Sequence, residues 1–350
     1  MTAADVDPAR RLTPVVRLAP AKLNLTLAVV GRRADGYHTL HSVMAPLALA
    51  DRLSLAVDPV SDAGDSLRVE GFDAGPMADN LVLLALEATR RALRPHVAAP
   101  PPALAVRLDK RIPVAAGLAG GSSDAAATID GALEAWSASD VFGADERSAL
   151  AASIGSDVPF FLAGGPALIE GRGERVRPLR GLRPLASEKI PGLLLVTPAV
   201  AAHTAAVFAA WSGGAMGQPG IAARSSEHFA AEFGSGMSAR QFLERAGVLA
   251  SANDLLPAAA VVVDGLVAFR RALIRLVGRP IGLSGSGPTL WALYPSLDDA
   301  ELAAESVRAA VSTGFIPAPG DDAPFVAATT LLVTPDELIT LDPPTARSYA

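Results

Sequence analysis

Residues 110–124 constrain this chain more than any other stretch, and they read Lys-Arg-Ile-Pro-Val-Ala-Ala-Gly-Leu-Ala-Gly-Gly-Ser-Ser-Asp. Gly117, Gly120 and Gly121 permit backbone angles that other residues resist, and they leave no side chain in the way of a ligand. A glycine-rich loop that enters a helix presents free backbone N–H groups and the positive end of the helix dipole. The stretch therefore predicts an anion site suited to phosphate. The alternative is a tight strand-to-helix turn without a ligand.

The residues after this loop predict a helix, because apolar side chains recur there at helical spacing. These side chains are Ala126, Ile129, Leu133 and Trp136. Ser122, Ser123 and Asp124 precede them and belong to the residue types that cap helix N-termini, so we expect the N-cap among these three.

Two well-known phosphate loops do not fit this stretch. The P-loop requires a Gly-Lys-Ser/Thr sequence, and no lysine follows Gly120 or Gly121. The dinucleotide fingerprint G-x-G-x-x-G is broken in every register by Ala119 and Ser123.

The composition is that of a globular protein with room for two domains. The chain has 350 residues, of which 50% are hydrophobic and 19% are charged. A net charge of −6 argues against a nucleic-acid scaffold, and the lack of cysteine excludes disulfides, thiolate zinc sites and cysteine nucleophiles. Residues 1–13 lack the apolar core of a signal peptide. Prolines and glycines interrupt the longest uncharged run, residues 190–223, so we expect a cytoplasmic protein without a membrane span.

Residues 15–30 predict two strands that are separated at Pro20. Alternation from there places Lys22, Asn24 and Thr26 on one face of a strand. Taken alone, a lysine and an asparagine in this arrangement favour a solvated strand face. The alternative is a pair of side chains that face a ligand.

Tyr37 and His38 follow a basic, glycine-flanked turn, where a strand resumes. They suit a structural role and a ligand-facing edge equally well. Asp157 precedes Pro159 and by itself suits a turn or a cap. In a chain that also has Lys22 and a phosphate loop, this carboxylate is suited to accept a hydroxyl proton during phosphoryl transfer.

In the rest of the chain, proline- and glycine-containing turns separate the expected helices and strands. We expect a helix over residues 79–93, capped by Asp79 or Asn80, and a hairpin over 167–176. A proline-rich domain boundary is expected at 178–191, followed by a buried strand from Leu193. We also expect a mobile insert at 212–236 and either a hairpin or a second glycine loop at 281–294. Residues 321–350 have no functional interpretation.

Residues 113–123 resemble the second motif of the GHMP kinases, the superfamily of galactokinase, homoserine kinase and mevalonate kinase, which wraps the phosphates of ATP. Ala119 replaces a usual glycine, and we expect it to adopt an ordinary backbone conformation. Residues 281–294 resemble the third motif of the superfamily. Residues 20–25, 31–38 and 155–161 resemble the members that phosphorylate a cytidine-diphosphate-linked methylerythritol.

The resemblance implies an α+β, two-domain GHMP kinase fold. A ribosomal protein S5 domain 2-like N-terminal domain would cover residues 14–179, and a ferredoxin-like C-terminal domain would cover residues 180–340. The implied reaction is ATP-dependent phosphorylation of the substrate's 2-hydroxyl group, a step of the non-mevalonate route to isoprenoids.

The resemblance also implies the site residues. Lys22 and Asp157 would be catalytic, and Asn24, Tyr37, His38, Thr204 and Phe208 would bind the substrate, with Met44 at a further lining position. ATP would be bound by Pro113, Val114, Ala115, Ala116, Gly117, Leu118, Ala119, Gly120, Gly121, Ser122, Ser123, Asn80 and Leu81. Mg²⁺ would accompany ATP, with Ser122 as a candidate contact and no residue assigned as a metal ligand. The partner would be a small molecule and not a nucleic acid or a membrane, and the protein would be a monomer or a weak homodimer.

Two rival interpretations remain. One is a GHMP kinase of homoserine or of a mevalonate derivative, against which the Tyr37-His38 turn speaks. The other is a catalytically inactive nucleotide-binding regulator, which loss of Lys22 or Asp157 would have indicated; both residues are present.

Overall fold

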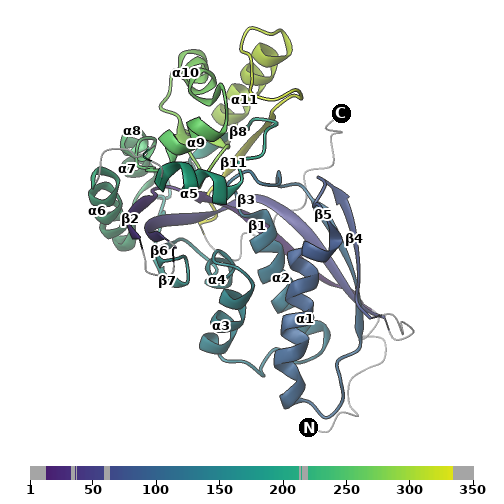
Figure 1. The fold of residues 1–350 in the computed structure, drawn as a ribbon. Helices are drawn as coiled ribbons and strands as arrows, with labels where there is room; N and C mark the ends of the chain where they lie inside the picture. The colour runs from purple at the N-terminus through teal and green to yellow at the C-terminus, as the bar shows by residue number, and fades with distance from the viewer. Residues whose placement is uncertain are drawn as a thin grey trace. The chain divides into compact units, whose positions relative to one another are not determined.

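The computed structural model describes residues 13–32, 36, 38–58, 64–212, 214 and 220–333. They divide into two compact units, each discontinuous in sequence (Figure 1). The first comprises the chain up to Ala21, Ala50–Val114 and Ala119–Leu162. The second comprises Lys22–Leu49, Ala115–Leu118 and the chain from Ala163. The expected sequence domains at 14–179 and 180–340 stay a prediction.

In the first unit, helices pack on a small sheet. Strand β5 (Ala103–Lys110) pairs in parallel with β4 (Ser66–Gly71) and antiparallel with the second half of β3 (His38–Asp58). Alternate residues of β5 are buried, which places Leu104, Val106 and Leu108 in the core. The helices and 3₁₀ turns are η2 (Met77–Asp79), α1 (Leu81–Leu93), η3 (Arg94–His96), α2 (Gly120–Ala135), α3 (Ala144–Ile154) and α4 (Val158–Leu162).

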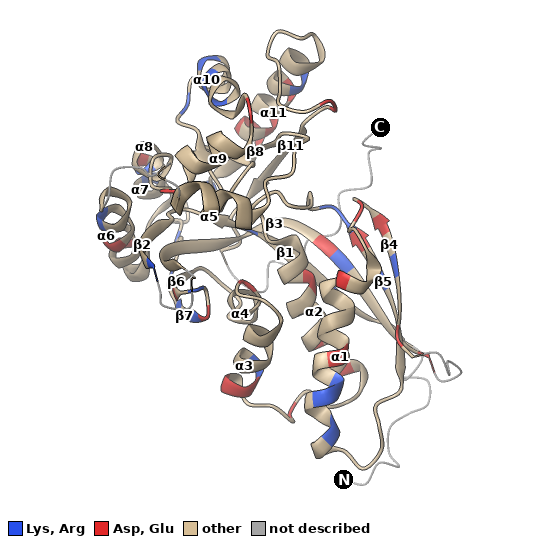
Figure 2. Ribbon diagram, in the orientation of Figure 1, with Lys and Arg blue, Asp and Glu red and all other residues tan. Residues whose placement is uncertain are grey.

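Helix α1 packs against α2 and begins where the sequence predicts. The Asn80 side chain accepts a 3.0 Å hydrogen bond from Val82 N, so Asn80 and not Asp79 is the N-cap. Arg90 and Arg91 lie in the last turn, where cations complement the helix dipole (Figure 2).

In the second unit, a four-stranded antiparallel sheet has the order β11 (Phe325–Thr330), β8 (Gly192–Thr197), β10 (Leu290–Tyr294), β9 (Gly282–Leu283). Every residue of β8 and β10 is buried, which explains why both read as continuous apolar runs. The helices are α5 (Thr204–Ser212), α6 (Ile221–Ser235), α7 (Ala239–Glu244), α8 (Ala246–Leu249), α9 (Leu256–Val262), α10 (Leu266–Val277) and α11 (Leu297–Ser312).

The second unit also holds the first half of β3, which pairs with β2 (Ala28–Arg32) and β6 (Ala167–Gly171); β6 pairs in turn with β7 (Arg175–Pro178). The hairpin predicted over 167–176, the buried strand from Leu193 and the hairpin of 281–294 are thus confirmed.

Two expectations about continuity and mobility are wrong. Pro20 lies inside a single strand, β1 (Val15–Asn24), because a proline is tolerated in a strand wherever the ladder does not use its N–H. Residues 221–235 of the expected mobile insert form helix α6, in which Phe229 and Phe233 are buried and stack with ring centroids 5.0 Å apart. Residues 213 and 215–219 of that insert lie outside the described residues.

The C-terminal extension contributes to the fold as far as it is described. Strand β11 pairs with β8 along its whole length and so forms an edge of the four-stranded sheet. Residues 334–350 lie outside the described part of the chain.

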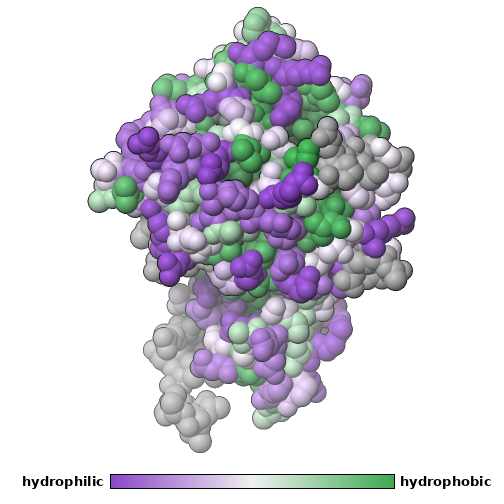
Figure 3. Space-filling view, turned by 90° about the vertical axis from the view of Figure 1, so that its left-hand side faces the viewer, coloured by the Kyte–Doolittle hydropathy of each residue, from purple (hydrophilic) through white to green (hydrophobic). Residues whose placement is uncertain are grey.

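In the view of Figure 3, the hydrophobic residues among those described lie in small groups among hydrophilic ones. Among the described residues, no helix combines the length and apolar character needed to span a membrane.

Candidate active site

The glycine-rich loop enters α2 earlier than the sequence predicts. Helix α2 begins at Gly120, and its N-cap is Ala119, which makes no side-chain cap. The prediction that Ser122, Ser123 or Asp124 caps the helix is therefore wrong. Ala119 has φ +54°, a left-handed conformation, so the expectation of an ordinary backbone there is also wrong. The first N–H groups of α2 have no side-chain cap, which suits the binding of an anion.

The preceding part of the loop, residues 115–118, packs against the turn between β9 and β10. Gly117 has φ +76°, and a Cβ atom on it would lie 2.3 Å from the carbonyl oxygen of Ser284. Thr289 N donates to Ala116 O at 3.3 Å. Only glycine permits this approach at position 117, so the second and third motif stretches are joined through their backbones in the second unit.

Lys22 and Asn24 lie side by side at the end of β1. The Lys22 ammonium donates to Asn24 Oδ1 at 2.5 Å and to Gly117 O at 2.8 Å. Both side chains are buried, with exposed fractions of 3% and 2%. The shared face predicted for them is confirmed, and the solvated-face alternative is wrong. A buried ammonium fixed by these two oxygens supplies a local positive charge, which phosphoryl transfer uses.

Asp157 belongs to the first unit, where it precedes α4 and is half-buried. A backbone hydrogen bond from Val158 N to Gly155 O, 3.2 Å long, closes the turn that contains it. The short helix that follows buries Val158 and Phe160 and thereby anchors the carboxylate on a packed element.

Sequence reasoning missed a buried charge cluster beside the start of α2. The Lys110 ammonium donates to Asp51 Oδ2 and, at 2.8 Å, to Asp124 Oδ2. The exposed fractions are 4% for Lys110, 0% for Asp51 and 2% for Asp124. A Cβ atom on Gly120 would lie 3.0 Å from Lys110 Nζ, so the cluster directly supports the entry to the helix.

Alternation provided a signal for this cluster. Lys110 shares the buried face of β5 with Leu104 and Leu108, and Asp51 shares the buried face of β3 with Leu53. A charged residue on an apolar strand face requires a buried partner.

The pKa values in the cluster follow from burial and pairing. Burial raises the pKa of Asp124 to about 8, although the Lys110 charge acts in the opposite direction. For Lys110, burial lowers the pKa, but the charges of Asp124 and Asp51 outweigh burial and raise it. We conclude that Lys110 stays charged and that Asp124 keeps its proton near neutral pH.

The predicted substrate residues that are described lie in the second unit. His38 stacks on Phe208 with ring centroids 5.0 Å apart and an angle of 17° between the planes, and its Nε2 is 3.0 Å from Ser212 Oγ. Burial, followed by the charge of Arg32, lowers the pKa of His38. Thr204 Oγ1 lies 3.1 Å from Ser286 Oγ, next to the turn between β9 and β10.

We expected two further residues, Tyr37 and Met44, to line the substrate site. Tyr37 lies outside the described residues. Met44 is buried in β3 opposite Ala167, which leaves 4% of its surface exposed. Of the predicted ATP-binding residues outside the loop, Asn80 serves as the α1 cap, and Leu81 Cδ1 would lie 3.5 Å from a Cβ atom on Gly121.

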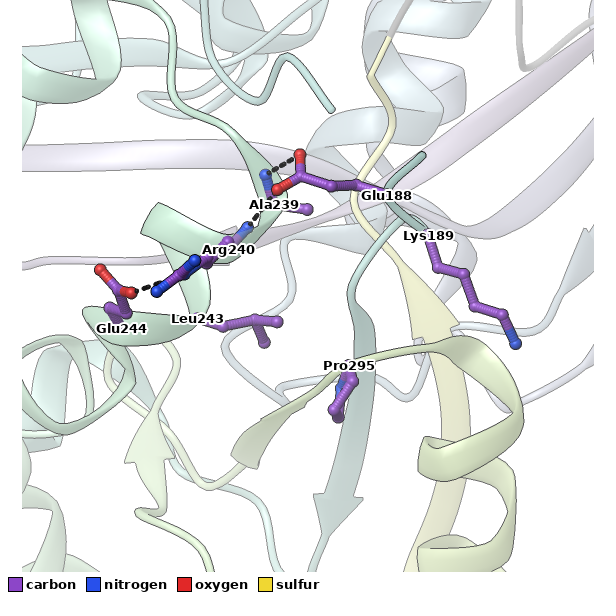
Figure 4. Close-up of a pocket in the computed structure, with 7 residues that line it drawn as sticks. All are labelled: Glu188, Lys189, Ala239, Arg240, Leu243, Glu244 and Pro295. Carbon is purple, nitrogen blue, oxygen red and sulfur yellow. Dashed lines mark hydrogen bonds and ion pairs between the residues drawn. The ribbon is translucent and has the colours of Figure 1, made fainter. Parts of the chain in front are cut away.

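An open pocket of about 390 Å³ lies elsewhere in the second unit (Figure 4). It is lined by Glu188, Lys189, Ala239, Arg240, Leu243, Glu244 and Pro295, none of which is a predicted site residue. Glu188 accepts hydrogen bonds from the backbone N–H groups of Ala239 and Arg240, and Arg240 pairs with Glu244 at 3.1 Å. These charges are already paired within the protein, so the pocket is a poor candidate for phosphoryl transfer.

Comparison with known proteins supports the sequence motifs. Residues 80–165 match the family described as "GHMP kinases N terminal domain". A 4-diphosphocytidyl-2-C-methyl-D-erythritol kinase from Pelotomaculum thermopropionicum is 37% identical over 295 residues, which cover 84% of this chain and 94% of that protein.

Comparison with solved structures agrees with these sequence matches. A crystal structure of 4-(cytidine 5'-diphospho)-2C-methyl-D-erythritol kinase has a TM-score of 0.61 at 31% identity and covers 90% of this chain and 99% of that one. The mevalonate kinase of Methanococcus jannaschii has a TM-score of 0.62 at 12% identity over 91% of this chain and 99% of that one, a likeness of fold alone. The predicted α+β GHMP kinase fold is thereby confirmed.

Proposed function

The chain belongs to the family of 4-diphosphocytidyl-2-C-methyl-D-erythritol kinases, and we propose that it transfers the γ-phosphoryl group of ATP to the 2-hydroxyl group of the substrate named there. This reaction is a step of the non-mevalonate route to isoprenoids. The observation that carries the proposal is the 37% identity to one such kinase over 94% of its length. The buried Lys22, held beside Asn24 and Gly117, adds a physical reason, since phosphoryl transfer is catalysed mainly by positioning and by charge.

ATP is the phosphoryl donor of the reaction, as membership of the GHMP kinases implies. We propose that its phosphates bind at the loop of residues 113–123 and at the uncapped N-terminus of α2. The free N–H groups there and the buried Ser123 hydroxyl, which has no hydrogen-bond partner among the described residues, favour this placement.

The proposed catalytic roles follow from charge. Lys22 stabilises the negative charge that develops on the transferred phosphoryl group, and Asp157 accepts the proton of the attacking hydroxyl group. For the cytosine base, Phe208 offers a ring face and His38 offers a ring nitrogen. Because these two rings stack on each other in the structure, the base has to displace His38 or use the opposite face of Phe208.

Mg²⁺ is proposed to arrive with ATP. Among the residues that the structure describes, no group of three or more histidine, cysteine or acidic side chains is arranged to hold a metal ion. Mg²⁺ bound mainly by phosphate oxygens and water requires no such group, and Ser122 and Ser123 offer hydroxyl oxygens near the proposed phosphate site. When bound, the ion would neutralise charge on the phosphates. We also propose that the protein is cytoplasmic and acts as a monomer or a weak homodimer.

The test is an assay of ATP consumption with 4-diphosphocytidyl-2-C-methyl-D-erythritol, homoserine and mevalonate as separate acceptors. We expect turnover with the cytidylyl substrate alone and a product phosphorylated at the 2-hydroxyl position. Turnover with homoserine or mevalonate at a comparable kcat/KM would overturn the proposal.

A further inference from the structure

The orientation of the Asn24 side chain follows from counting hydrogen-bond donors. Ser42 Oγ lies 2.6 Å from Thr26 O, and because a carbonyl oxygen only accepts, the single hydroxyl hydrogen of Ser42 is used there. The group of Asn24 that faces Ser42 Oγ at 2.8 Å must then be the donating NH₂ group. This leaves Asn24 Oδ1 directed at the Lys22 ammonium, 2.5 Å away.

The far end of this chain of hydrogen bonds is fixed by helix α6. Thr26 Oγ1 accepts from Val43 N at 3.0 Å and lies 2.7 Å from Ser226 Oγ. Ser226 Oγ in turn contacts His41, at 2.8 Å from Nδ1 and 3.2 Å from the carbonyl oxygen. Thr26, Ser42 and Ser226 have exposed fractions of 1% or less, so water does not compete for these bonds.

The chain is mechanical and does not conduct protons. Ser42 donates to the main-chain oxygen of Thr26, whereas Ser226 contacts the side-chain oxygen of the same residue. These two hydroxyl groups therefore do not exchange a proton through Thr26. What is transmitted is the position of Thr26, and through Ser42 the orientation of the Asn24 amide.

We propose that Ser42 is a positioning residue for phosphoryl transfer, which fixes the Asn24 amide with its oxygen toward Lys22, and that Ser226 of α6 holds the far end of the arrangement. The inference rests on the proposed function. Without the Ser42 hydroxyl group, the Asn24 NH₂ group loses its acceptor and only the Lys22 contact still orients the amide. The amide is then free to rotate out of this position and to displace Lys22. A misplacement of about 1 Å in a catalytic group is enough to lower the rate about 10²-fold.

The experiment is a double-mutant cycle of Ser42→Ala and Asn24→Asp, measured as kcat with ATP and the cytidylyl substrate. We expect Ser42→Ala to lower kcat by about 10- to 100-fold and to leave the KM for ATP unchanged. In the Asn24→Asp background the same change is expected to cost less than about threefold, because a carboxylate presents an oxygen to Lys22 in either orientation. If Ser42 had a merely structural role, Ser42→Ala would lower kcat by the same factor in the wild-type and Asn24→Asp backgrounds.

Two control variants separate positioning from loss of a buried hydroxyl group. Thr89 is fully buried and donates to Ala85 O at 2.7 Å, so Thr89→Val is expected to lower Tm and to preserve kcat. Ser235 is also on α6 but bonds to Ala231 O of its own helix, so Ser235→Ala is expected to match the wild type.

The outcomes are distinguishable from failure of the proposed function. A wild-type protein that does not phosphorylate the cytidylyl substrate refutes the function, whereas an active wild type with unchanged kcat in Ser42→Ala, or equal losses in both backgrounds, overturns the positioning role. If a variant of the cycle does not fold or does not turn over substrate, the kcat of Ser226→Ala tests the positioning role instead. A lower kcat with Ser235→Ala unchanged supports the proposal, and a wild-type kcat in Ser226→Ala overturns it.

Discussion

The Lys110 ammonium donates a 2.8 Å hydrogen bond to Asp124 Oδ2, and both side chains are buried beside the first residues of α2. Asp51 is the second carboxylate on the same ammonium, and its Oδ1 also accepts from Ile112 N at 2.8 Å. The cluster thus ties β3, β5, the glycine loop and α2 together within the first unit. Removal of Lys110 would leave Asp51 buried without its cation, which is strongly destabilising in a buried ion pair.

The stability of the protein is expected to depend on pH through Asp124. The folded state holds the Asp124 proton up to about pH 8, whereas the ordinary pKa is 3.8. Between these values the folded state binds more protons than the unfolded chain, so the free energy of unfolding falls as the pH rises, by at most about 1.4 kcal/mol per pH unit. Asp124→Asn removes this dependence, so the variant gains stability relative to the wild type from about pH 5 to about pH 8.

The measurement is urea unfolding of both proteins across this range, with Asp322→Asn as a control at an exposed carboxylate. A difference in unfolding free energy that stays constant with pH would contradict the assigned proton.

Replacement of Lys22 tests its proposed role as a cation that acts in the transition state. We expect Lys22→Ala to lower kcat by roughly 10²–10³-fold and to change the substrate KM by no larger factor. Lys189→Ala is the matched control, because Lys189 pairs with Asp298 at the surface. If steady-state kinetics show a change in KM alone, Lys22 binds substrate and does not stabilise the transition state.

Replacement of Asp157 tests the proposed general base. Asp157→Asn keeps the size of the side chain but removes its capacity to take a proton, so we expect kcat to fall about 10²–10⁴-fold while ATP still binds. Calorimetric titration with ATP checks binding, and Asp140→Asn at an exposed position is the control. A variant with more than about a tenth of the wild-type kcat would remove Asp157 from the mechanism.

Gly121 offers a cleaner test of the phosphate loop than Gly120. A Cβ atom on Gly120 would approach Ile112 and Lys110 to 3.0 Å, so a side chain there would disturb the core, whereas on Gly121 the nearest atom is 3.5 Å away. We expect Gly121→Val to fold and to weaken ATP binding by at least about tenfold, since the side chain blocks the approach of phosphate to the N–H groups. Gly165→Val is the control, because a Cβ atom there meets nothing within 4 Å. Unchanged ATP affinity in a folded Gly121→Val protein would place the phosphates elsewhere.

The ring of Phe208 is expected to support the cytosine base. Phe208→Ala should raise the KM of the cytidylyl substrate roughly 5- to 150-fold, the value of one base–aromatic stack, and leave the KM for ATP unchanged. His38→Ala should reduce discrimination between cytidine and uridine forms of the substrate. Phe315→Ala, at a ring that is 77% exposed, serves as the control. Wild-type affinity for the cytidylyl substrate in both variants would move the base pocket away from α5.

Local sequence patterns alone determined much of the fold and the family of this protein. The Asn80 cap, the hairpins and the apolar strands were predictable because each depends on residues a few positions apart. The positions of Lys22 and Asn24 on one face followed from strand alternation in the same way.

Only the tertiary structure decided the contacts that hold the site in place. Lys110 and Asp51 are 59 residues apart, and Thr26 and Ser226 are 200 apart, so no local pattern pairs them. The left-handed Ala119 goes against the preference of an alanine, and only the packing around it can impose that conformation. Burial is the common physical reason: a polar group removed from water must find a partner wherever the fold supplies one, and the sequence does not state where that is.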